Sequence, residues 1–482
     1  MTSDEHSTCV SAPGKVLVCG GYLVLDPQYS GLVIGTDSRF FSTVSARIDS
    51  QQPPRRILVR SPQFDDGKWE FDLDERFGVN PASRKDGKPA ARNKFVEYAL
   101  QLCFSVISAS SSNFDVRFGS WMEIVIVGHN DFYSQRPQLE KLGLPITTAS
   151  LRSLKPFCPT LTTIGDVHKT GLGSSAAMIT SLVAALLSHF GVNTSTKDDA
   201  FIHNMAQFVH CLAQGKVGSG FDVSSAIYGS HLYKRFDPDI IASLMSRCEE
   251  VGVYKVSADE ILKVVKETKW DSEVTPMKLP PRVRLMLADV DAGSSTPKLV
   301  GGVLGWRKAN PIEAEKLWGK LDAENMRVAK VLMNLSQIAN LNGKEYEDAV
   351  GLCGRTVSSS WIGSENRAVK LFGEAASSFL NVRHHLRTMS ALANVPIEPP
   401  SQTRLLNSIA ALPGIIMTGV PGAGGFDAIF VLVIDTPGNA EAVEGVWAQW
   451  SESKVGPLLA GASDDGFKKV HVADVEGLAR LF

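Results

Sequence analysis

The stretch His168-Lys-Thr-Gly-Leu-Gly-Ser-Ser-Ala-Ala-Met178 decides the fold of this chain. Residues 160–167 lie before it and alternate polar with apolar side chains, as a strand does. Apolar residues at helical spacing follow it and end at Phe190-Gly191, where the glycine suits the position after the last helical turn. The segment therefore predicts a strand, a glycine loop and a helix in succession.

The glycine loop has the features of a phosphate site. Gly171 and Gly173 let the backbone approach a ligand closely, and Ser174 is a favourable N-cap residue. Free N–H groups at the start of a helix, with the helix dipole behind them, attract an anion. Lys169 adds a mobile positive charge. We therefore expect the phosphates of a nucleotide at this turn.

Three other interpretations of the loop compete with this one. A Walker motif carries its lysine after the last glycine, whereas Lys169 precedes both glycines. Residues 171–176 also satisfy the relaxed dinucleotide pattern, which requires an acidic residue at the end of the next strand. Asp198 and Asp199 lie near that distance but in a predicted helix. A purely structural turn between strand and helix is the third alternative.

A lysine and an aspartate stand in two further glycine-bearing segments. The segment Ser11-Ala-Pro-Gly-Lys15 places Lys15 at the start of an apolar strand predicted over residues 16–24. In Gln214-Gly-Lys-Val-Gly-Ser-Gly-Phe-Asp222, the aspartate stands where the loop re-enters regular structure. Taken singly, a lysine beside a turn is usually solvated, and an aspartate at such a place usually caps a helix.

A polar stripe precedes the second of these segments. His203, Gln207, His210 and Gln214 recur at helical spacing in the otherwise apolar residues 200–213. This stripe could face a wet cleft, but two histidines without further clustered ligands do not complete a zinc site. Buried histidines with hydrogen-bond partners are the favoured interpretation.

The length of 482 residues and the 44% hydrophobic content favour two packed domains of the α+β class. Charged residues and three prolines predict a linker at residues 267–282, between domains at 1–266 and 283–482. Strands are predicted at 122–127, 283–289, 414–419 and 428–435, and helices at 95–109, 311–341 and 363–392.

The bulk charge points to a small-molecule partner. A formal net charge of −2 gives no global field that would draw the protein to nucleic acid or to an anionic membrane. The longest apolar stretch, residues 176–187, falls well short of a membrane span. The seven cysteines form no C-x-x-C pair and are expected to be reduced, buried thiols. The expectation is a cytoplasmic enzyme, either a monomer or a homodimer.

The three glycine segments together resemble the signature motifs of the GHMP kinases. These are Ala12-Pro-Gly-Lys15, Gly171-Leu-Gly-Ser-Ser-Ala176 and Pro421-Gly-Ala-Gly-Gly425. The third cluster, taken alone, is an ordinary connection between two strand-like runs. Further segments resemble phosphomevalonate kinases of the fungal type, namely Gly20-Gly-Tyr-Leu-Val-Leu25, Gln214–Asp222, Val395-Pro-Ile-Glu-Pro-Pro400 and Asp289-Val-Asp-Ala-Gly-Ser-Ser-Thr-Pro297.

The resemblance implies a two-domain GHMP kinase fold, with an N-terminal domain like domain 2 of ribosomal protein S5 and a ferredoxin-like C-terminal domain. It implies ATP and Mg²⁺ as cofactors and phosphomevalonate as the acceptor. Lys15 and Asp222 then form the catalytic pair, and Ser175 lies near Mg²⁺. The ATP-binding residues would be Lys169, Thr170, Gly171, Leu172, Gly173, Ser174, Ser175, Ala176, Ala177, Met178 and Ile179. The substrate-binding residues would be Tyr22, Lys216, Ser219, Gly422, Ala423 and Gly424.

Two departures from related enzymes bear on this hypothesis. Gly21-Tyr22 stands where mevalonate and galactose kinases carry Glu-His, which argues against those two substrates. The position of the Mg²⁺-binding glutamate of mevalonate kinase falls on Cys211 here. Another GHMP enzyme, such as mevalonate kinase or diphosphomevalonate decarboxylase, and a non-catalytic sensor of the same fold are the alternatives. Because a phosphate acceptor is already deprotonated, we expect Asp222 to orient Lys15 rather than to act as a base.

Overall fold

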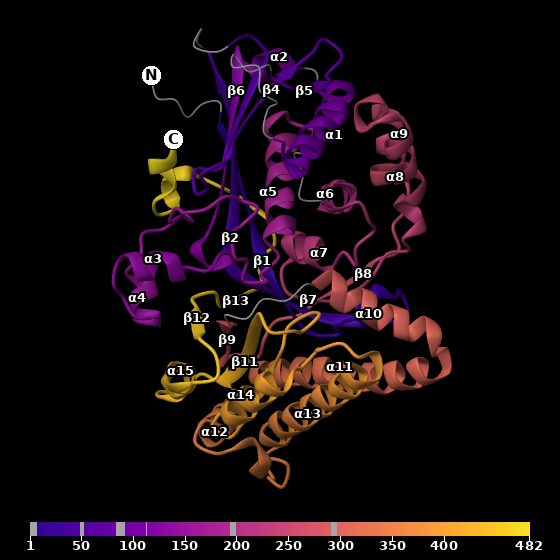
Figure 1. The fold of residues 1–482 in the computed structure, drawn as a ribbon. Helices are drawn as coiled ribbons and strands as arrows, with labels where there is room; N and C mark the ends of the chain where they lie inside the picture. The colour runs from indigo at the N-terminus through magenta and orange to yellow at the C-terminus, as the bar shows by residue number, and fades with distance from the viewer. Residues whose placement is uncertain (1–6, 49–52, 83–91, 112, 193–198, 291–295) are drawn as a thin grey trace.

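The computed structural model describes residues 7–48, 53–82, 92–111, 113–192, 199–290 and 296–482. Figure 1 shows two α+β units, one above the other, with the first part of the chain in the upper unit. The predicted fold class is therefore confirmed. Across the described ranges, none of the helices combines the length and the apolar content that a membrane crossing needs. All seven cysteines are buried and unpaired, as expected.

The N-terminal unit is built on one large sheet. Its long strand β2 (Ser30–Arg47) pairs antiparallel with β1 (Ser7–Cys19) on one side and with β6 (Trp121–Gly128) on the other. Every residue of β6 is buried, which explains why its sequence is apolar apart from Glu123 rather than alternating. The sheet continues through β3 (Arg56–Arg60), β4 (Lys68–Leu73) and β5 (Val79–Pro81), and β7 (His231–Lys234) joins β2 at the other end.

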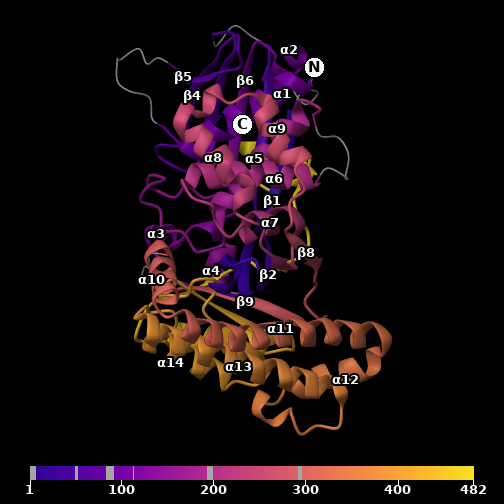
Figure 2. The same cartoon turned by 90° about the vertical axis from the view of Figure 1, so that its right-hand side faces the viewer.

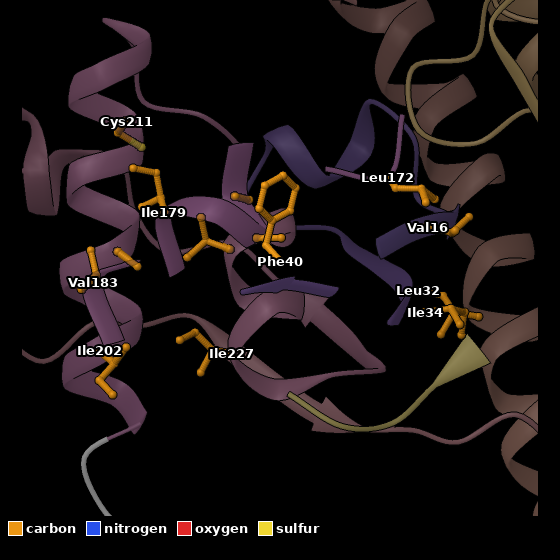
Figure 3. Packing of buried hydrophobic residues seen from close by; sticks show 14 of the residues in the cluster. Val16, Leu32, Ile34, Phe40, Leu172, Ile179, Val183, Ile202, Cys211 and Ile227 are labelled. Carbon is orange, nitrogen blue, oxygen red and sulfur yellow. The ribbon is translucent and has the colours of Figure 1, made fainter. Parts of the chain in front are cut away.

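Helices cover one face of this sheet. In Figure 1, α1 (Lys94–Ser110), α5 (Ser174–His189) and α6 (Asp199–Gln214) lie beside the strands, with α8 (Asp239–Val251) and α9 (Ala258–Leu262) outside them. The helix α5 packs directly on β1 and β2 and is buried along most of its length, so it is apolar on nearly all sides. Figure 3 shows Ile179 and Val183 in this core, with Ile202 close by.

The C-terminal unit has the ferredoxin-like topology that the resemblance implied. Its sheet has the order β10-β11-β9-β12, and all neighbouring strands are antiparallel. The strands are β9 (Val283–Val290), β10 (Ile415–Gly419), β11 (Ala428–Ile434) and β12 (Val455–Leu458).

Helices fill the connections of this unit. The long helices α11 (Pro311–Leu341) and α13 (Arg367–Ala393) pack side by side at the bottom of the view in Figure 2. The other helices are α10 (Thr296–Ala309), α12 (Gly343–Cys353), α14 (Pro400–Ala410) and α15 (Asn439–Gln449).

Two connections between the units were not predicted. The segment 267–282, predicted as a linker, contains β8 (Glu273–Pro276), which pairs with β7 of the larger sheet. After β12 the chain returns to the N-terminal unit, where β13 (Ala462–Ser463) pairs with β2 and β14 (Lys468–Val470) pairs with β1. The buried guanidinium of Arg39 holds this returning segment through the carbonyl oxygens of Asp465 and Gly466. The division at residues 266 and 283 stays a prediction.

Three local predictions were wrong. The strand predicted over 16–24 ends at Cys19, because Gly20 and Tyr22 adopt positive φ and a short 3-10 helix (Leu23–Leu25) follows. Residues 160–167 form no strand; their polar side chains serve turns, as in the hydrogen bond from Thr163 Oγ1 to Asp166 Oδ2. The N-cap of α5 is Gly173 in the left-handed conformation, and Ser174 is the first helical residue.

Candidate active site

The phosphate loop lies between the first strand and the start of α5. Gly171 and Gly173 have φ of +81° and +78°, the left-handed conformation that favours glycine. The backbone N–H of Lys15 donates to the carbonyl oxygen of Leu172 at 2.9 Å, and Thr170 Oγ1 donates to the carbonyl oxygen of Asp131. Hydrogen bonds thus hold the loop on both sides. The first N–H groups of α5 have no partners within the helix and lie next to the loop.

The predicted ATP-binding residues fall into two groups in the structure. Leu172, Ala176, Ala177 and Ile179 have buried side chains that anchor the loop and the helix in the core. Lys169 and Gly171 are exposed, and the remaining members of the group are half-buried at the mouth of the loop, apart from the buried Thr170. Asp199 lies in α6, and Asp198 lies outside the described residues, so the described acidic residue of the dinucleotide pattern is in a helix and not at a strand end.

Lys15 reaches the loop with its side chain. Its Nζ atom donates a hydrogen bond of 2.7 Å to the carbonyl oxygen of Gly171 and lies 5.4 Å from the centre of the Phe221 ring. Burial lowers the pKa of the Lys15 ammonium, and the negative charge of Asp222 partly offsets this effect. The two predicted catalytic residues therefore interact electrostatically across β1 and α7 (Phe221–Tyr228).

Asp222 is the second residue of α7, at the end of the glycine loop that follows α6. Gly220 is the N-cap of this helix with φ +86°, and a Cβ there would lie 2.7 Å from the hydroxyl of Tyr233. Only glycine therefore fits at this turn without displacing its neighbours. The carboxylate of Asp222 accepts the N–H of Val223 at 3.0 Å, and its side chain is 22% exposed. This geometry presents the carboxylate at the N-terminus of a helix and leaves it accessible.

His210 belongs to the site, although the sequence did not assign it. Its Nε2 atom lies 3.0 Å from Ser175 Oγ, 3.0 Å from Gln214 Nε2 and 4.0 Å from Asp222 Oδ2. Burial lowers the pKa of His210, and Lys216 adds to this while Asp222 opposes it. The helical spacing with Gln214 was the signal that could have found it. His203 of the same stripe is a buried histidine bonded to Asn204, as expected.

Two glycine segments predicted to bind the substrate come from different units of the fold and pack against each other. The hydroxyl of Tyr22 donates to the carbonyl oxygen of Ala423 at 2.6 Å, and the N–H of Gly422 donates to the carbonyl oxygen of Leu17 at 3.1 Å. A Cβ on Gly21 would lie 2.3 Å from the carbonyl oxygen of Gly422. The two backbones are therefore packed as closely as glycine allows.

The other predicted substrate-binding residues have contacts of their own. Gly424 has φ +71° and packs against the carbonyl oxygen of Ile397. Lys216 is exposed in the loop between α6 and α7, and its charge acts on His210. The carbonyl oxygen of Ser219 accepts the hydroxyl of Tyr233 at 2.9 Å, so the backbone of this loop is fixed.

An apolar pocket opens beside the phosphate loop, with a cavity volume of about 100 Å³. Lys169, Ser174 and Ser175 line one side of it. The rest of the lining is mostly aromatic and aliphatic and comes from the strands, from the start of α1 and from the segment before the loop. It includes Phe40, Phe64, Trp69, Phe95, Tyr133, Ile164, Val167 and Met178, with the polar Asn93 among them. This pocket could not be predicted from the sequence, because its walls come from segments far apart in the chain.

Comparison with known proteins identifies the family. The model of the GHMP kinases N terminal domain matches residues 148–230, which include the phosphate loop and Asp222. The peroxisomal phosphomevalonate kinase of Arabidopsis thaliana is 36% identical over 95% of this chain and 94% of its own length. The phosphomevalonate kinase erg8 of Aspergillus fumigatus is 36% identical over 93% of this chain and 91% of its own length. This chain belongs to the phosphomevalonate kinase family.

A solved structure has the same overall fold as this chain. A Streptococcus pneumoniae phosphomevalonate kinase, determined in complex with phosphomevalonate and AMPPNP, is 15% identical and matches with a TM-score of 0.55. The match covers 96% of this chain and 99% of that chain. The two-domain GHMP kinase architecture is therefore shared along nearly the whole length.

The sequence predicts that Cys211 stands at the position of the Mg²⁺-binding glutamate of mevalonate kinases. In the structure the Cys211 thiol is buried and accepts a hydrogen bond from Gln207 Nε2 at 3.1 Å. Burial raises the pKa of the Cys211 thiol. Figure 3 shows Cys211 among the buried hydrophobic side chains. The described part of the chain contains no cluster of three or more His, Cys, Asp and Glu side chains that could hold a metal ion.

Proposed function

We propose that this protein transfers the γ-phosphoryl group of ATP to phosphomevalonate, giving diphosphomevalonate and ADP, with Lys15 as the central cation of the site. The observation that carries the proposal is the position of Lys15, whose Nζ atom bonds the phosphate loop at Gly171 while its charge interacts with Asp222. Phosphoryl transfer depends on cations that position the donor and the acceptor and offset their charge, rather than on a reactive nucleophile on the protein.

ATP would bind with its phosphates at residues 169–179 and its base in the neighbouring pocket. The free N–H groups at the start of α5 suit phosphate oxygens, and Lys169 lines both the loop and the pocket. The aromatic side chains of Phe64, Phe95 and Tyr133 offer faces and edges on which a purine can pack. The pocket and the loop are continuous, so one nucleotide can span both.

The acceptor would bind where Tyr22 meets the loop of Gly422, Ala423 and Gly424. Its phosphate is mostly dianionic at neutral pH because the second pKa of a phosphate monoester is about 6. Two unit charges at about 4 Å repel each other by about 4 kcal/mol at an effective dielectric of about 20. The charges of Lys15, Lys169 and Lys216 would offset this repulsion as donor and acceptor approach.

Asp222 would orient Lys15 rather than remove a proton, since the attacking phosphate oxygen is already ionised. Ser175 Oγ lies 3.0 Å from His210 Nε2, and Asp222 Oδ2 lies 4.0 Å from the same atom. Hydroxyl and carboxylate oxygens are hard ligands that suit Mg²⁺ together with nucleotide phosphates. Ser175 and Asp222 would therefore hold the metal, which would neutralise charge on the nucleotide. This supports the Mg²⁺ expectation at Ser175 and adds Asp222 to it.

Product analysis tests the proposal. Protein incubated with ATP, Mg²⁺ and phosphomevalonate should yield diphosphomevalonate, detected by its mass and by the ³¹P signals of a diphosphate ester. Formation of a product only from mevalonate, or loss of CO₂ from diphosphomevalonate, would assign the chain to another GHMP reaction. Nucleotide binding without any product would favour a sensor. The cytoplasmic location expected from the sequence is a proposal that cell fractionation would test, since the Arabidopsis relative is named peroxisomal.

A further inference from the structure

The carboxylate of Asp289 joins the two domains beside the phosphate loop. Asp289 lies near the end of β9 in the C-terminal unit, and its side chain is 5% exposed. Its Oδ1 atom lies 3.1 Å from His168 Nε2. Its Oδ2 atom accepts hydrogen bonds from Ser134 Oγ at 3.1 Å and from Arg136 Nε at 3.2 Å. Three residues of the N-terminal unit thus converge on one buried carboxylate, an arrangement that we call the Asp289 bridge.

On the N-terminal side, the Asp289 bridge holds the start of the phosphate loop. His168 directly precedes Lys169, and its carbonyl oxygen accepts the N–H of Ser134 at 3.0 Å. The neighbouring residues Tyr133 and Lys169 pair as an isolated antiparallel β-bridge. The Asp289 bridge therefore holds the side chain of His168 and, through Ser134, the backbone segment that supports the loop.

On the C-terminal side, the same strand end holds the acceptor loop. Asp289 is paired with Ala428 of β11, the first residue after residues 419–427. The N–H of Val290 donates to the carbonyl oxygen of Asp427 at 2.7 Å. One short path of hydrogen bonds therefore runs from His168, through Asp289, to the end of the loop that contains Gly422 and Ala423.

We propose that Asp289 is a positioning residue for phosphoryl transfer, which sets the phosphate loop at a fixed distance from the acceptor loop. The proposal rests on the proposed function, because it requires a donor and an acceptor on the two loops. In-line transfer is sensitive to placement, and a misplacement of about 1 Å can cost about 100-fold in rate. Asp289 is buried and fully engaged by protein groups, so it acts through His168 and the two loops and does not contact the substrates.

The ionisation of Asp289 is consistent with a permanent bridge. Burial raises the pKa of its carboxyl group, but the hydrogen bond with His168 and the charge of Arg136 outweigh burial and hold the pKa below its usual range. The carboxylate of Asp289 is therefore charged throughout the neutral range, so the Asp289 bridge does not depend on pH within that range.

The experiment compares Asp289→Ala, His168→Ala and His168→Gln with the wild type in ADP release at saturating ATP and phosphomevalonate, and measures ATP binding directly by calorimetry. We expect kcat to fall at least 10-fold in both alanine variants, with the ATP Kd within about 3-fold of wild type. His168→Gln keeps a donor toward Asp289 and should recover most of kcat. The double alanine variant should be no slower than the slower single variant, because both remove one interaction.

Thr148→Val is the matched control. It removes another inter-domain hydrogen bond, from Thr148 Oγ1 to Glu444 Oε1 at 2.8 Å, in a different part of the interface. Its kcat should stay within 2-fold of wild type. Because the His168 side chain is 38% exposed, the His168 variants decide the matter even if Asp289→Ala fails to fold.

The outcomes separate the two hypotheses. Active wild type with a kcat within 2-fold in His168→Ala, or losses that multiply in the double variant, would overturn the role of Asp289. An equal loss in Thr148→Val would show a general effect of the interface and would overturn it too. A wild type without turnover of phosphomevalonate would contradict the proposed function itself.

Discussion

The Nζ atom of Lys15 lies 2.7 Å from the carbonyl oxygen of Gly171, so the first strand of the protein and its phosphate loop are joined by a charge-assisted hydrogen bond. In this position the ammonium is held at the end of the loop where donor phosphates would bind, with Asp222 close enough to influence its pKa. The bond fixes the cation before any substrate arrives, and such preorganisation is the main source of electrostatic catalysis.

Removing the charge of Lys15 should be costly. Lys15→Met keeps much of the side-chain volume but removes the ammonium, and we expect kcat/KM to fall by roughly 100-fold to 1,000-fold, as for other preorganised donors in active sites. Initial rates of ADP release give the measurement, and Lys255→Met, at an exposed site in a different part of the domain, is the control. A kcat/KM within a few-fold of wild type would rule out Lys15 as the central cation.

The pH profile should distinguish an orienting Asp222 from a general base. Activity requires charged Lys15, whose pKa is lowered by burial, so the rate should fall with rising pH below the range of an ordinary lysine. In Asp222→Asn the charge that raises this pKa is lost, and the fall should begin at lower pH. Rates measured from pH 6 to pH 10 test this, with the unfolding of each variant checked at the same pH values. A rise in rate with pH that disappears in Asp222→Asn would instead identify a base.

Two glycines of the phosphate loop offer a matched pair of substitutions. Both have positive φ, so alanine at either position costs roughly 1–2 kcal/mol of backbone strain. A Cβ at Gly173 would lie 2.9 Å from Cε of Lys15, whereas a Cβ at Gly171 would meet nothing within 4 Å. We therefore expect Gly173→Ala to lower kcat/KM for ATP at least 10-fold more than Gly171→Ala does. Equal losses in the two variants would show that strain alone matters and that Lys15 is not displaced.

The sequence predicted the parts of the site that are local in the chain. The phosphate loop, Lys15 and Asp222 each stand in a glycine-bearing motif, and the structure brings the three together. Ser174 was assigned as the cap of α5 on side-chain preference, but a glycine in the left-handed conformation makes the turn at Gly173. Local side-chain preference does not show which backbone conformation a turn needs.

Long-range features could not be predicted from one sequence. The return of residues 462–470 to the first sheet depends on strand edges left open by β1 and β2, and on the buried Arg39 that bonds the returning carbonyl oxygens. His210 was expected to be a buried histidine, and it is buried, but its ring faces Ser175 from a neighbouring helix. Helical spacing indicates which residues share a face and does not indicate what that face meets.

The close contact between Gly21 and Gly422 predicts a further effect. A Cβ added at Gly21 would lie 2.3 Å from the carbonyl oxygen of Gly422, so Gly21→Ala must move one backbone away from the other. We expect kcat/KM for phosphomevalonate to fall at least 10-fold while the Kd for ATP changes little, because the phosphate loop is not touched. Gly301→Ala, in α10 where a Cβ meets nothing within 4 Å, is the control and should keep wild-type kinetics. Unchanged kinetics in Gly21→Ala would remove this contact from the acceptor site.

The most direct test of the account is the ratio of kcat/KM for phosphomevalonate to that for mevalonate, measured by ADP release with the same enzyme, ATP and Mg²⁺. If the charges of Lys15, Lys169 and Lys216 offset the repulsion between donor and acceptor phosphates, as proposed, the enzyme requires a negatively charged acceptor, and the ratio should be at least 1,000. A ratio near or below one would contradict the account, because an uncharged hydroxyl would then be accepted as readily as a phosphate.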